Sequence, residues 1–230
     1  MTGVRQTNDG VVKTSGGAAQ TTAGTLLIDD WEDGDQTGWA GTDDTTVTTT
    51  AIQGDYSLEH SSTSFIKVTS GPGVTNPLPN YPAKGATVSW LVDTSSLSAD
   101  CWLVAFGSGD GTGSGSYNIQ ARIKSGGDFV LREEVNGTES TISADTSGPL
   151  ASDTIYEITL EWVDPNDATA TAYEWDTTNQ ERGVKVAEES GAVDASHDTN
   201  NNGVVELWFS GDGTQVERVD RHVILEGPTI

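Results

Sequence analysis

Apolar and polar residues alternate in short runs after Leu26, and clusters of Gly, Asn, Asp and Pro separate these runs. In the run 88–92, for example, Val88, Trp90 and Val92 share one face. Because successive side chains of a strand point to opposite faces, this period of two predicts strands with one buried and one solvated side. Helical periodicity is nearly absent, so we predict an all-β protein. The predicted strands span 45–52, 56–60, 65–68, 88–92, 101–106, 117–123, 129–135, 139–142, 156–162, 169–175, 184–188, 204–209 and 216–225.

The clearest turn signal is Asn136-Gly137, which lies between the runs 129–135 and 139–142. Asn-Gly supplies the two positive-φ residues of a type I′ turn, so the pair predicts a tight β-hairpin. Asn136-Gly137-Thr138 is also the only N-glycosylation sequon of the chain. Turn chemistry explains these residues without a sugar, and modification is the alternative.

The segment from Met1 to Gly24 is polar and made of small residues, so it offers almost nothing to bury. Such a composition predicts disorder when the segment is alone. It is either a mobile terminus or a tether that becomes ordered against a neighbouring subunit. We therefore expect a flexible N-terminal arm over residues 1–25 and one β-sandwich domain over residues 26–230.

Bulk composition is compatible with one good core, since 34% of the residues are hydrophobic and seven are Trp. The single cysteine, Cys101, excludes an internal disulfide, and its apolar neighbours predict a buried thiol. We expect no membrane insertion, because no apolar run approaches the length of about 18 residues that a membrane helix needs. The first residues also lack the hydrophobic segment of an export signal, so we expect no self-export.

The chain is also strongly acidic, because it has 35 acidic and 11 basic residues, which give a formal net charge of −24. A surface of this kind repels itself until salt screens it, and the Debye length falls from about 8 Å at 0.15 M salt to about 3 Å at 1 M. The composition therefore predicts a protein of a high-salt environment, typical of salt-loving archaea. The same charge argues against nucleic acid or anionic lipid as a partner. A mesophilic acidic adhesin is the alternative.

Four stretches resemble the concanavalin A-like lectin/glucanase domains, laminin-G-like jelly rolls found in exported and viral proteins of haloarchaea. They are 27–35 with Gly38-Trp39; 51–59; 117–124 with 126–129; and 152–162 followed by the closing run 218–225. The resemblance covers residues 26 to about 227 and rests on the order of loose motifs, so it specifies fold better than function. It implies an all-β, two-sheet antiparallel jelly-roll sandwich with an extended N-terminal arm.

A candidate ligand surface follows from the alternation in 117–124. Ile119, Ala121 and Ile123 fall on one face of this strand, which leaves Asn118, Gln120 and Arg122 on the other, with Arg132 on the neighbouring strand. In a chain so poor in cations, this polar face is a candidate concave ligand-binding face. The alternative is a solvated face whose cations offset nearby acids. The seven Trp side chains are most simply interpreted as core and sheet packing, with sugar stacking as the alternative.

Catalysis is not expected. Glucanases of the resembled superfamily place three acids at alternating positions of one strand, so that all three face the scissile bond. Glu174 and Asp176 match the first two positions, but Thr178 stands at the third, and the next acid, Glu181, lies beyond a turn-like segment. We therefore interpret Glu174 and Asp176 as the end of a hairpin strand. The histidines have no recognisable nucleophile partner, and no phosphate-binding loop is present.

Calcium is the one candidate cofactor. Asp198, Asn200 and Asn202, followed by Gly203, match the first half of a calcium loop, where oxygens at positions one, three and five converge. Phe209 stands where such a loop has its bidentate Glu, so another segment would have to complete the shell. A plain polar loop is the alternative. A second, weaker metal site would combine acids near the first strand with one of the last strand: Glu32, Asp33, Asp35 and Asp220.

Together these features predict a non-enzymatic structural or attachment protein of a haloarchaeal virus particle, such as a capsid decoration, turret or tail-fibre subunit of the virion. The expected partners are other virion proteins, bound through the N-terminal arm, further copies in a homo-oligomer, and host surface glycans. A cell-surface or secreted carbohydrate-binding module or adhesin of a halophilic archaeon is the alternative. A hydrolase fragment is a third reading, against which the incomplete acid triad counts.

Overall fold

The alternating segments form two antiparallel β-sheets that lie face to face. A computed structural model describes residues 25–41, 44–60, 65–71, 78–95, 100–108, 115–163, 166–210 and 217–229. The predicted arm, residues 1–25, lies outside these ranges apart from Thr25, so it stays a prediction. Within the described ranges, no helix is long and apolar enough to cross a membrane.

The larger sheet has eight strands and brings together the first and last strands of the described chain. Strand β1 (Leu26–Asp29) lies off the main path and pairs with β14. The other strands follow in the order β12 (Glu181–Ala192), β11 (Asp167–Asp176), β10 (Ile155–Val163), β5 (Thr87–Asp93), β14 (Glu217–Glu226), β3 (Ser57–His60) and β2 (Thr45–Thr48).

The second sheet has six strands, and four of them form a meander of consecutive neighbours. Its order is β4 (Phe65–Ser70), β13 (Val204–Ser210), β6 (Asp100–Ser108), β7 (Tyr117–Ile123), β8 (Phe129–Val135) and β9 (Thr138–Asp145). Both sheets thus combine strands that are distant in sequence, as in a jelly-roll sandwich.

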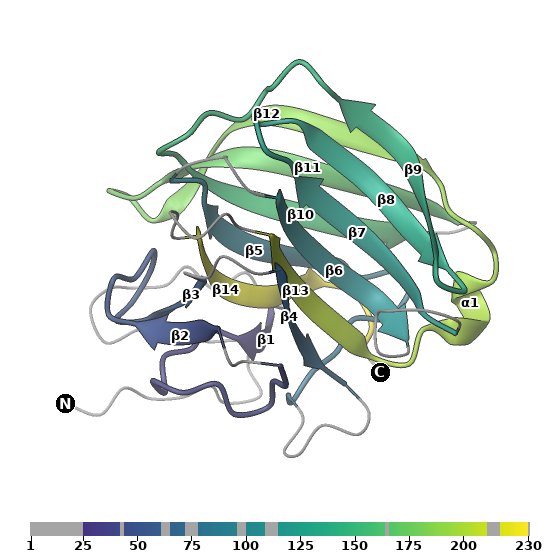
Figure 1. Cartoon of the computed structure of the whole chain (residues 1–230), viewed down its shortest axis with the longest axis horizontal. Helices are drawn as coiled ribbons and strands as arrows, with labels where there is room; N and C mark the ends of the chain where they lie inside the picture. The colour runs from purple at the N-terminus through teal and green to yellow at the C-terminus, as the bar shows by residue number, and fades with distance from the viewer. Residues whose placement is uncertain are drawn as a thin grey trace.

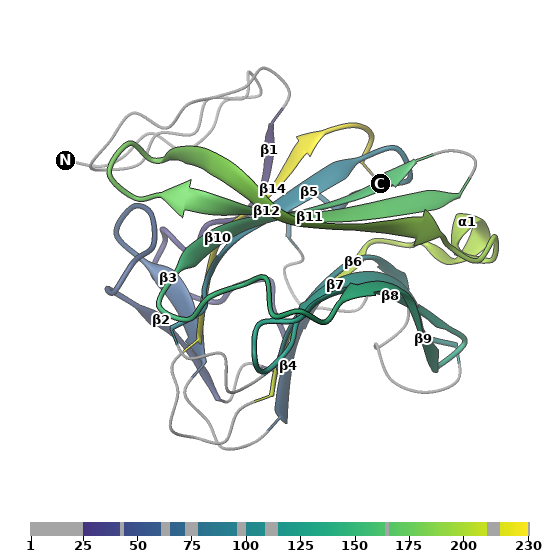
Figure 2. The same ribbon diagram turned by 90° about the horizontal axis from the view of Figure 1, so that it is seen from above.

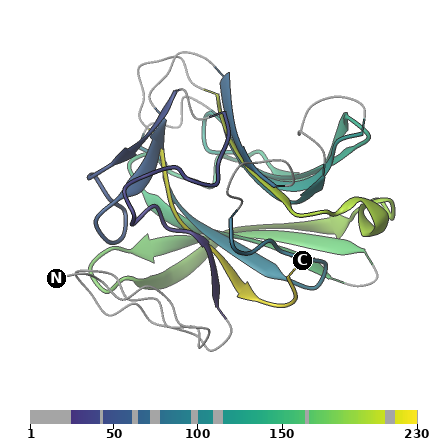
Figure 3. The same cartoon turned by 90° about the horizontal axis from the view of Figure 1, so that it is seen from below.

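The six-stranded sheet is curved. Figure 1 shows its strands in front of the larger sheet, and the views from above and below show its two edges, β4 and β9, bending away from that sheet (Figures 2 and 3). One face of the curved sheet therefore covers the core, and the concave face points outward. This geometry decides which of the alternating side chains can reach solvent.

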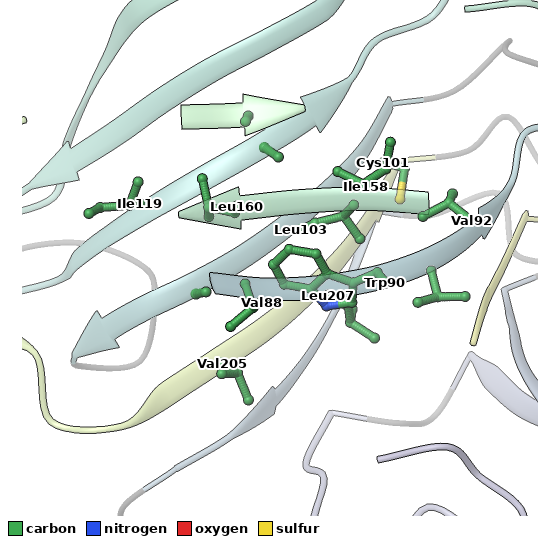
Figure 4. Packing of buried hydrophobic residues seen from close by; sticks show 14 of the residues in the cluster. Val88, Trp90, Val92, Cys101, Leu103, Ile119, Ile158, Leu160, Val205 and Leu207 are labelled. Atoms are coloured by element: carbon green, nitrogen blue, oxygen red, sulfur yellow. The ribbon is translucent and has the colours of Figure 1, made fainter. Parts of the chain in front are cut away.

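The core fills the space between the sheets with the inward-facing residues of both. Figure 4 shows Val88, Trp90 and Val92 of β5 packed against residues from the facing sheet, such as Leu103 and Leu207. Cys101 is 4% exposed in this cluster, which confirms the predicted buried thiol. Trp31, Trp39, Trp90 and Trp162 are also buried in the core.

The β8–β9 hairpin turns at Asn136-Gly137, as predicted. Both residues have positive φ, 51° and 79°, which a type I′ turn requires. The Gly137 N–H donates to the Ser116 carbonyl at 3.0 Å, and Asn136 Oδ1 accepts from the Gly115 N–H at 2.8 Å. The turn is therefore also anchored to the segment that precedes β7.

Two local predictions were wrong. Strand β2 ends at Thr48, short of residue 52, because the following segment loops back so that its amides can bind carboxylates near β1 and β14. The run 198–203, interpreted as the first half of a calcium loop or as a plain polar loop, begins within a one-turn helix, α1 (His197–Asn200). Its Asn200 side chain donates to the Ser196 carbonyl at 2.7 Å, which helps to close the turn.

Candidate functional site

The outer face of the six-stranded sheet collects the four residues predicted to bind a ligand. Strand register places Trp208, Trp102 and Arg122 in one cross-strand row, and Gln120 beside Arg132 in the next. We call this surface the polar face; it consists of Trp102, Val104, Asn118, Gln120, Arg122, Arg132, Glu134, Glu139, Glu206 and Trp208. The sheet thus brings Asn118, Gln120, Arg122 and Arg132 together.

A chain of hydrogen bonds runs along β7 and ends on β8 and β9. Arg122 Nε donates to Gln120 Oε1 at 2.6 Å, and Gln120 Nε2 donates to Asn118 Oδ1 at 2.5 Å. Asn118 Nδ2 in turn donates to Glu134 Oε2 at 2.7 Å. Each amide is used as both donor and acceptor, so the orientation of every side chain is fixed by its neighbours.

Two guanidinium groups meet at the other end of this chain. Arg122 Nη2 bonds Glu139 Oε1, and Arg132 Nη2 lies 3.1 Å from Glu139 Oε2. Burial lowers the pKa of Arg122 to about 10, the Glu139 carboxylate opposes this, and the Arg132 charge adds to it. One carboxylate therefore holds two cations that repel each other.

Trp102 stands between a second indole and a guanidinium. The ring centroids of Trp102 and Trp208 are 4.6 Å apart with an interplanar angle of 16°, and Arg122 Cζ lies 3.3 Å from the Trp102 ring centroid. Because β6 lies between β13 and β7, these two partners cover opposite faces of the Trp102 ring. The ring is consequently not an open platform for a sugar, and its role is to hold Arg122 by a cation–π contact.

Exposure divides the polar face into a covered and an accessible part. Asn118, Gln120 and Arg122 are only 1–2% exposed. The side chains of Arg132 and Glu139 are 20% and 30% exposed. A ligand would therefore meet Arg132 and Glu139 first, while the covered Arg122 holds Glu139 in place.

The sequence interpretation missed several members of the polar face, among them Trp102, Glu139 and Glu206. Glu206 accepts from Trp208 Nε1 at 2.9 Å, which ties the β13 end of the face together. The sequence could have identified each of them. Alternation puts Trp102 on the face opposite to buried Cys101, and it puts Glu206 on the face opposite to Leu207. The two-residue turn similarly places Glu139 directly across from Glu134.

The first calcium candidate stays a prediction. The structure places Asp198 and Asn200 in helix α1 and Asn202 just after it. Asp198 Oδ1 accepts from Lys84 Nζ at 2.6 Å, and Lys84 Nζ also donates to Asn166 at 2.5 Å. Among the described residues, no group of three or more His, Cys, Asp or Glu side chains is arranged to hold a metal ion.

The second calcium candidate involves carboxylates at the β1–β14 pair, and β1 does lie beside β14 as expected. Glu32 accepts from the amides of Asp55 and Tyr56, and Asp220 Oδ2 accepts from the Gln53 N–H at 2.8 Å. Burial raises the pKa of Glu32, and it raises that of Asp220 well above its ordinary value. These two carboxylates stabilise the loop after β2.

Glu174 and Asp176 lie at the end of β11, as the sequence predicted. Asp176 Oδ1 accepts from the Thr178 N–H at 2.8 Å and from the Asn179 N–H at 3.0 Å. These hydrogen bonds lower the pKa of Asp176 and fix its carboxylate in the β11–β12 turn.

The outer face of the eight-stranded sheet carries a separate ionic cluster around Glu157. This carboxylate accepts from Ser89 Oγ at 2.7 Å and Arg182 Nε at 2.7 Å, and Arg221 Nη1 lies 3.4 Å away. Although burial opposes it, these partners hold the pKa of Glu157 below its ordinary value. With a side-chain exposure of 3%, Glu157 is locked in place.

Comparison with known proteins identifies the class of fold. No known protein family matches the sequence, and no curated protein is significantly similar to it. A β-glucanase of Bacillus licheniformis superposes with a TM-score of 0.53 over 90% of this chain and 100% of its own, at 11% identity. A protein of unknown function from Shewanella oneidensis MR-1 superposes with a TM-score of 0.50 over 89% of this chain and 87% of its own, also at 11% identity.

A third similar structure is the HCR/D W1238A mutant, with a TM-score of 0.47 at 11% identity. The superposition covers 82% of this chain but only 43% of the mutant's length. The likeness to the β-glucanase shows the fold alone, at this level of identity. The chain thus has a two-sheet antiparallel jelly-roll sandwich, the fold of this β-glucanase, which confirms the predicted fold class.

Proposed function

We propose that the chain is a non-enzymatic attachment protein that binds glycans with the polar face. The observation that supports this most is the clustering of amides, carboxylates, guanidinium groups and indoles on the concave side of a jelly-roll sandwich. Sugar recognition needs fixed donors and acceptors more than mobile ones, because ordering a polar side chain on binding costs free energy. The hydrogen-bonded chain from Arg122 to Glu134 supplies that order in advance.

A glycan array in molar potassium chloride tests this proposal. The unmodified chain is expected to retain at least one class of glycan, and Arg132→Gln to lose most of that binding because Arg132 is an accessible member of the face. Lys185→Gln is the matched control, since it removes one positive charge from the opposite sheet at an exposed ion pair and leaves no buried carboxylate without its partner. Binding to no glycan at all, or equal loss in both variants, would overturn the proposal.

The absence of catalysis is part of the proposal. It is supported by the incomplete acid triad and by the turn amides that hold Asp176. Incubation of the protein with β-glucans under single-turnover conditions is expected to leave the substrate intact. Release of reducing ends that persists after repeated purification would make the protein a hydrolase.

We further propose that this attachment protein belongs to the virus particle of a halophilic archaeon, where the N-terminal arm anchors it to other particle proteins. The net charge of −24 supports a high-salt setting. Mass spectrometry of purified particles is expected to find the chain in stoichiometric amounts. Its recovery only from cell envelopes or culture medium would favour the alternative, a cellular carbohydrate-binding module or adhesin.

A further inference from the structure

We propose that the polar face contains a binding site for an anionic sugar substituent, a carboxylate or a sulfate ester, between Arg122 and Arg132. In the free chain, Glu139 occupies this site as an internal stand-in for the ligand. The inference rests on the proposed glycan binding and adds the class of sugar that the face selects.

The two guanidinium groups have more donors than partners. Arg122 uses Nε and Nη2, and within the described part of the chain Nη1 has no hydrogen-bond partner. Arg132 contacts Glu139 through Nη2, while its buried Nε has no partner in the ranges that the structure describes. Guanidinium groups bind carboxylate and sulfate-like oxygens with parallel hydrogen bonds, so the unused donors match an anionic group with two or three oxygens.

A comparison with the other shared carboxylate shows why Glu139 can leave its place. Glu157 also lies between two arginines, but it is buried and additionally accepts from Ser89. Glu139 has a partly exposed side chain, and among the described residues it bonds only Arg122 and Arg132. It belongs to the edge strand β9, where the surrounding residues 138–141 are exposed. Rotation of Glu139 away from the arginines therefore disturbs no core packing.

Arg122 is prepared for this role by its surroundings. Its side chain is 2% exposed and lies against Trp102, and its Nε is held by Gln120. Only the part of the Arg122 guanidinium that faces Arg132 and Glu139 is left to contact a ligand. Arg122 is thus a fixed anion-binding group, and Arg132 is the accessible one.

The net charge of −24 does not prevent this recognition in concentrated salt. At about 1 M salt the Debye length is about 3 Å, so the repulsion between the acidic surface and an acidic glycan is screened beyond direct contact. The attraction within an ion pair at hydrogen-bond distance is weakened less by this screening. Binding of acidic sugars is therefore expected to become stronger as salt rises from about 0.15 M toward 1 M.

The test measures affinity for three sets of oligosaccharides by calorimetry in molar potassium chloride: oligoglucuronates, sulfated oligoglucosides and neutral oligoglucosides. At least one acidic set is expected to bind more tightly than the neutral set. Arg132→Gln is expected to weaken acidic-sugar binding by about 10- to 100-fold, the loss typical of a hydrogen bond to a charged group. Neutral-sugar binding should weaken less than acidic-sugar binding, because hydrogen bonds are lost but no ion pair.

The variant Glu139→Gln distinguishes two roles of Glu139. Its carboxylate either occupies the place of the ligand in the free chain or only stabilises the two arginines. Removal of the competing charge is expected to strengthen acidic-sugar binding several-fold, whereas a structural role predicts weaker binding. Glu188→Gln is the matched control, because it removes one exposed carboxylate, paired with Lys185 at 3.0 Å, from the other sheet. Thermal melting of each variant verifies folding.

Two outcomes would overturn this inference. One is equal or better binding of neutral sugars by the unmodified chain, which would leave glycan binding intact and remove the anionic preference. The other is weaker acidic-sugar binding by Glu139→Gln than by the control. Failure of all three sugar sets to bind would instead overturn the proposed glycan function itself.

Discussion

Replacement of Asp29 by Asn is expected to flatten the dependence of stability on pH between about pH 4 and pH 7. Asp29 accepts from the Trp31 N–H at 2.9 Å and from Trp39 Nε1 at 2.6 Å. Burial nevertheless raises its pKa from 3.8 to about 7, because desolvation of the carboxylate outweighs these hydrogen bonds.

The sign of this pH dependence follows from the difference in bound protons between the folded and the unfolded chain. In this pH range the folded chain keeps a proton on Asp29 that the unfolded chain has lost, so the free energy of unfolding falls as pH rises. One pKa unit corresponds to about 1.4 kcal/mol, and a shift of about three units therefore gives at most about 4 kcal/mol over the whole range. Above about pH 7 both states are ionised and the contribution of Asp29 becomes constant.

Urea unfolding, followed by Trp fluorescence at fixed molar salt, measures this slope. The wild-type slope also contains Glu32 and Asp220, whose pKa values are raised in the same direction. Asp29→Asn should remove up to about 1.4 kcal/mol per pH unit from it. Exposed Asp153, which is not among the charges that act on Asp29, provides the control, Asp153→Asn. An Asp29→Asn variant with the wild-type slope would refute the burial argument, whatever its absolute stability.

Four further results are expected. Arg122→Met should lower the free energy of unfolding by about 2–3 kcal/mol, because it leaves the buried Gln120 oxygen without its donor and removes one of the two arginines that bind Glu139; a loss below about 0.5 kcal/mol in urea unfolding contradicts this. Gly137→Ala should cost about 1 kcal/mol, since its φ is 79°, and an unchanged melting temperature would count against the assigned turn. Val184→Lys should change stability by less than about 0.5 kcal/mol, because Val184 is 63% exposed; a larger loss would show that it is covered in solution. Dialysis from molar to millimolar salt should lower the melting temperature measured by circular dichroism, and a salt-independent melt would contradict the screening argument.

Much of the fold was predictable because the signals are local. Alternation along 117–123 assigned Ile119, Ala121 and Ile123 to the core and Asn118, Gln120 and Arg122 to the other face, and the structure agrees. Asn136-Gly137 fixed the position of a hairpin in the same way, because positive φ is a property of the residues themselves.

The candidate site was predictable only in part. The residues predicted to bind a ligand do share one face of β7 and β8, but the near-complete burial of Asn118, Gln120 and Arg122 was not predicted, because burial depends on which strands and side chains lie beside them. The helical turn at His197–Asn200 was also missed, since four residues are too few to establish a helical period. The pairing of Asp198 with Lys84 joins segments more than a hundred residues apart, which no local pattern records.

The sequence alone determined that this chain is an acidic all-β protein, and which face of most strands is apolar, because composition and a period of two are properties of neighbouring residues. Tertiary structure decided that β5 lies between β10 and β14, that Trp102 is enclosed by Trp208 and Arg122, and that Glu139 bridges two arginines. These arrangements depend on the order of strands across a sheet, which is set by the packing of the whole core and not by any single segment.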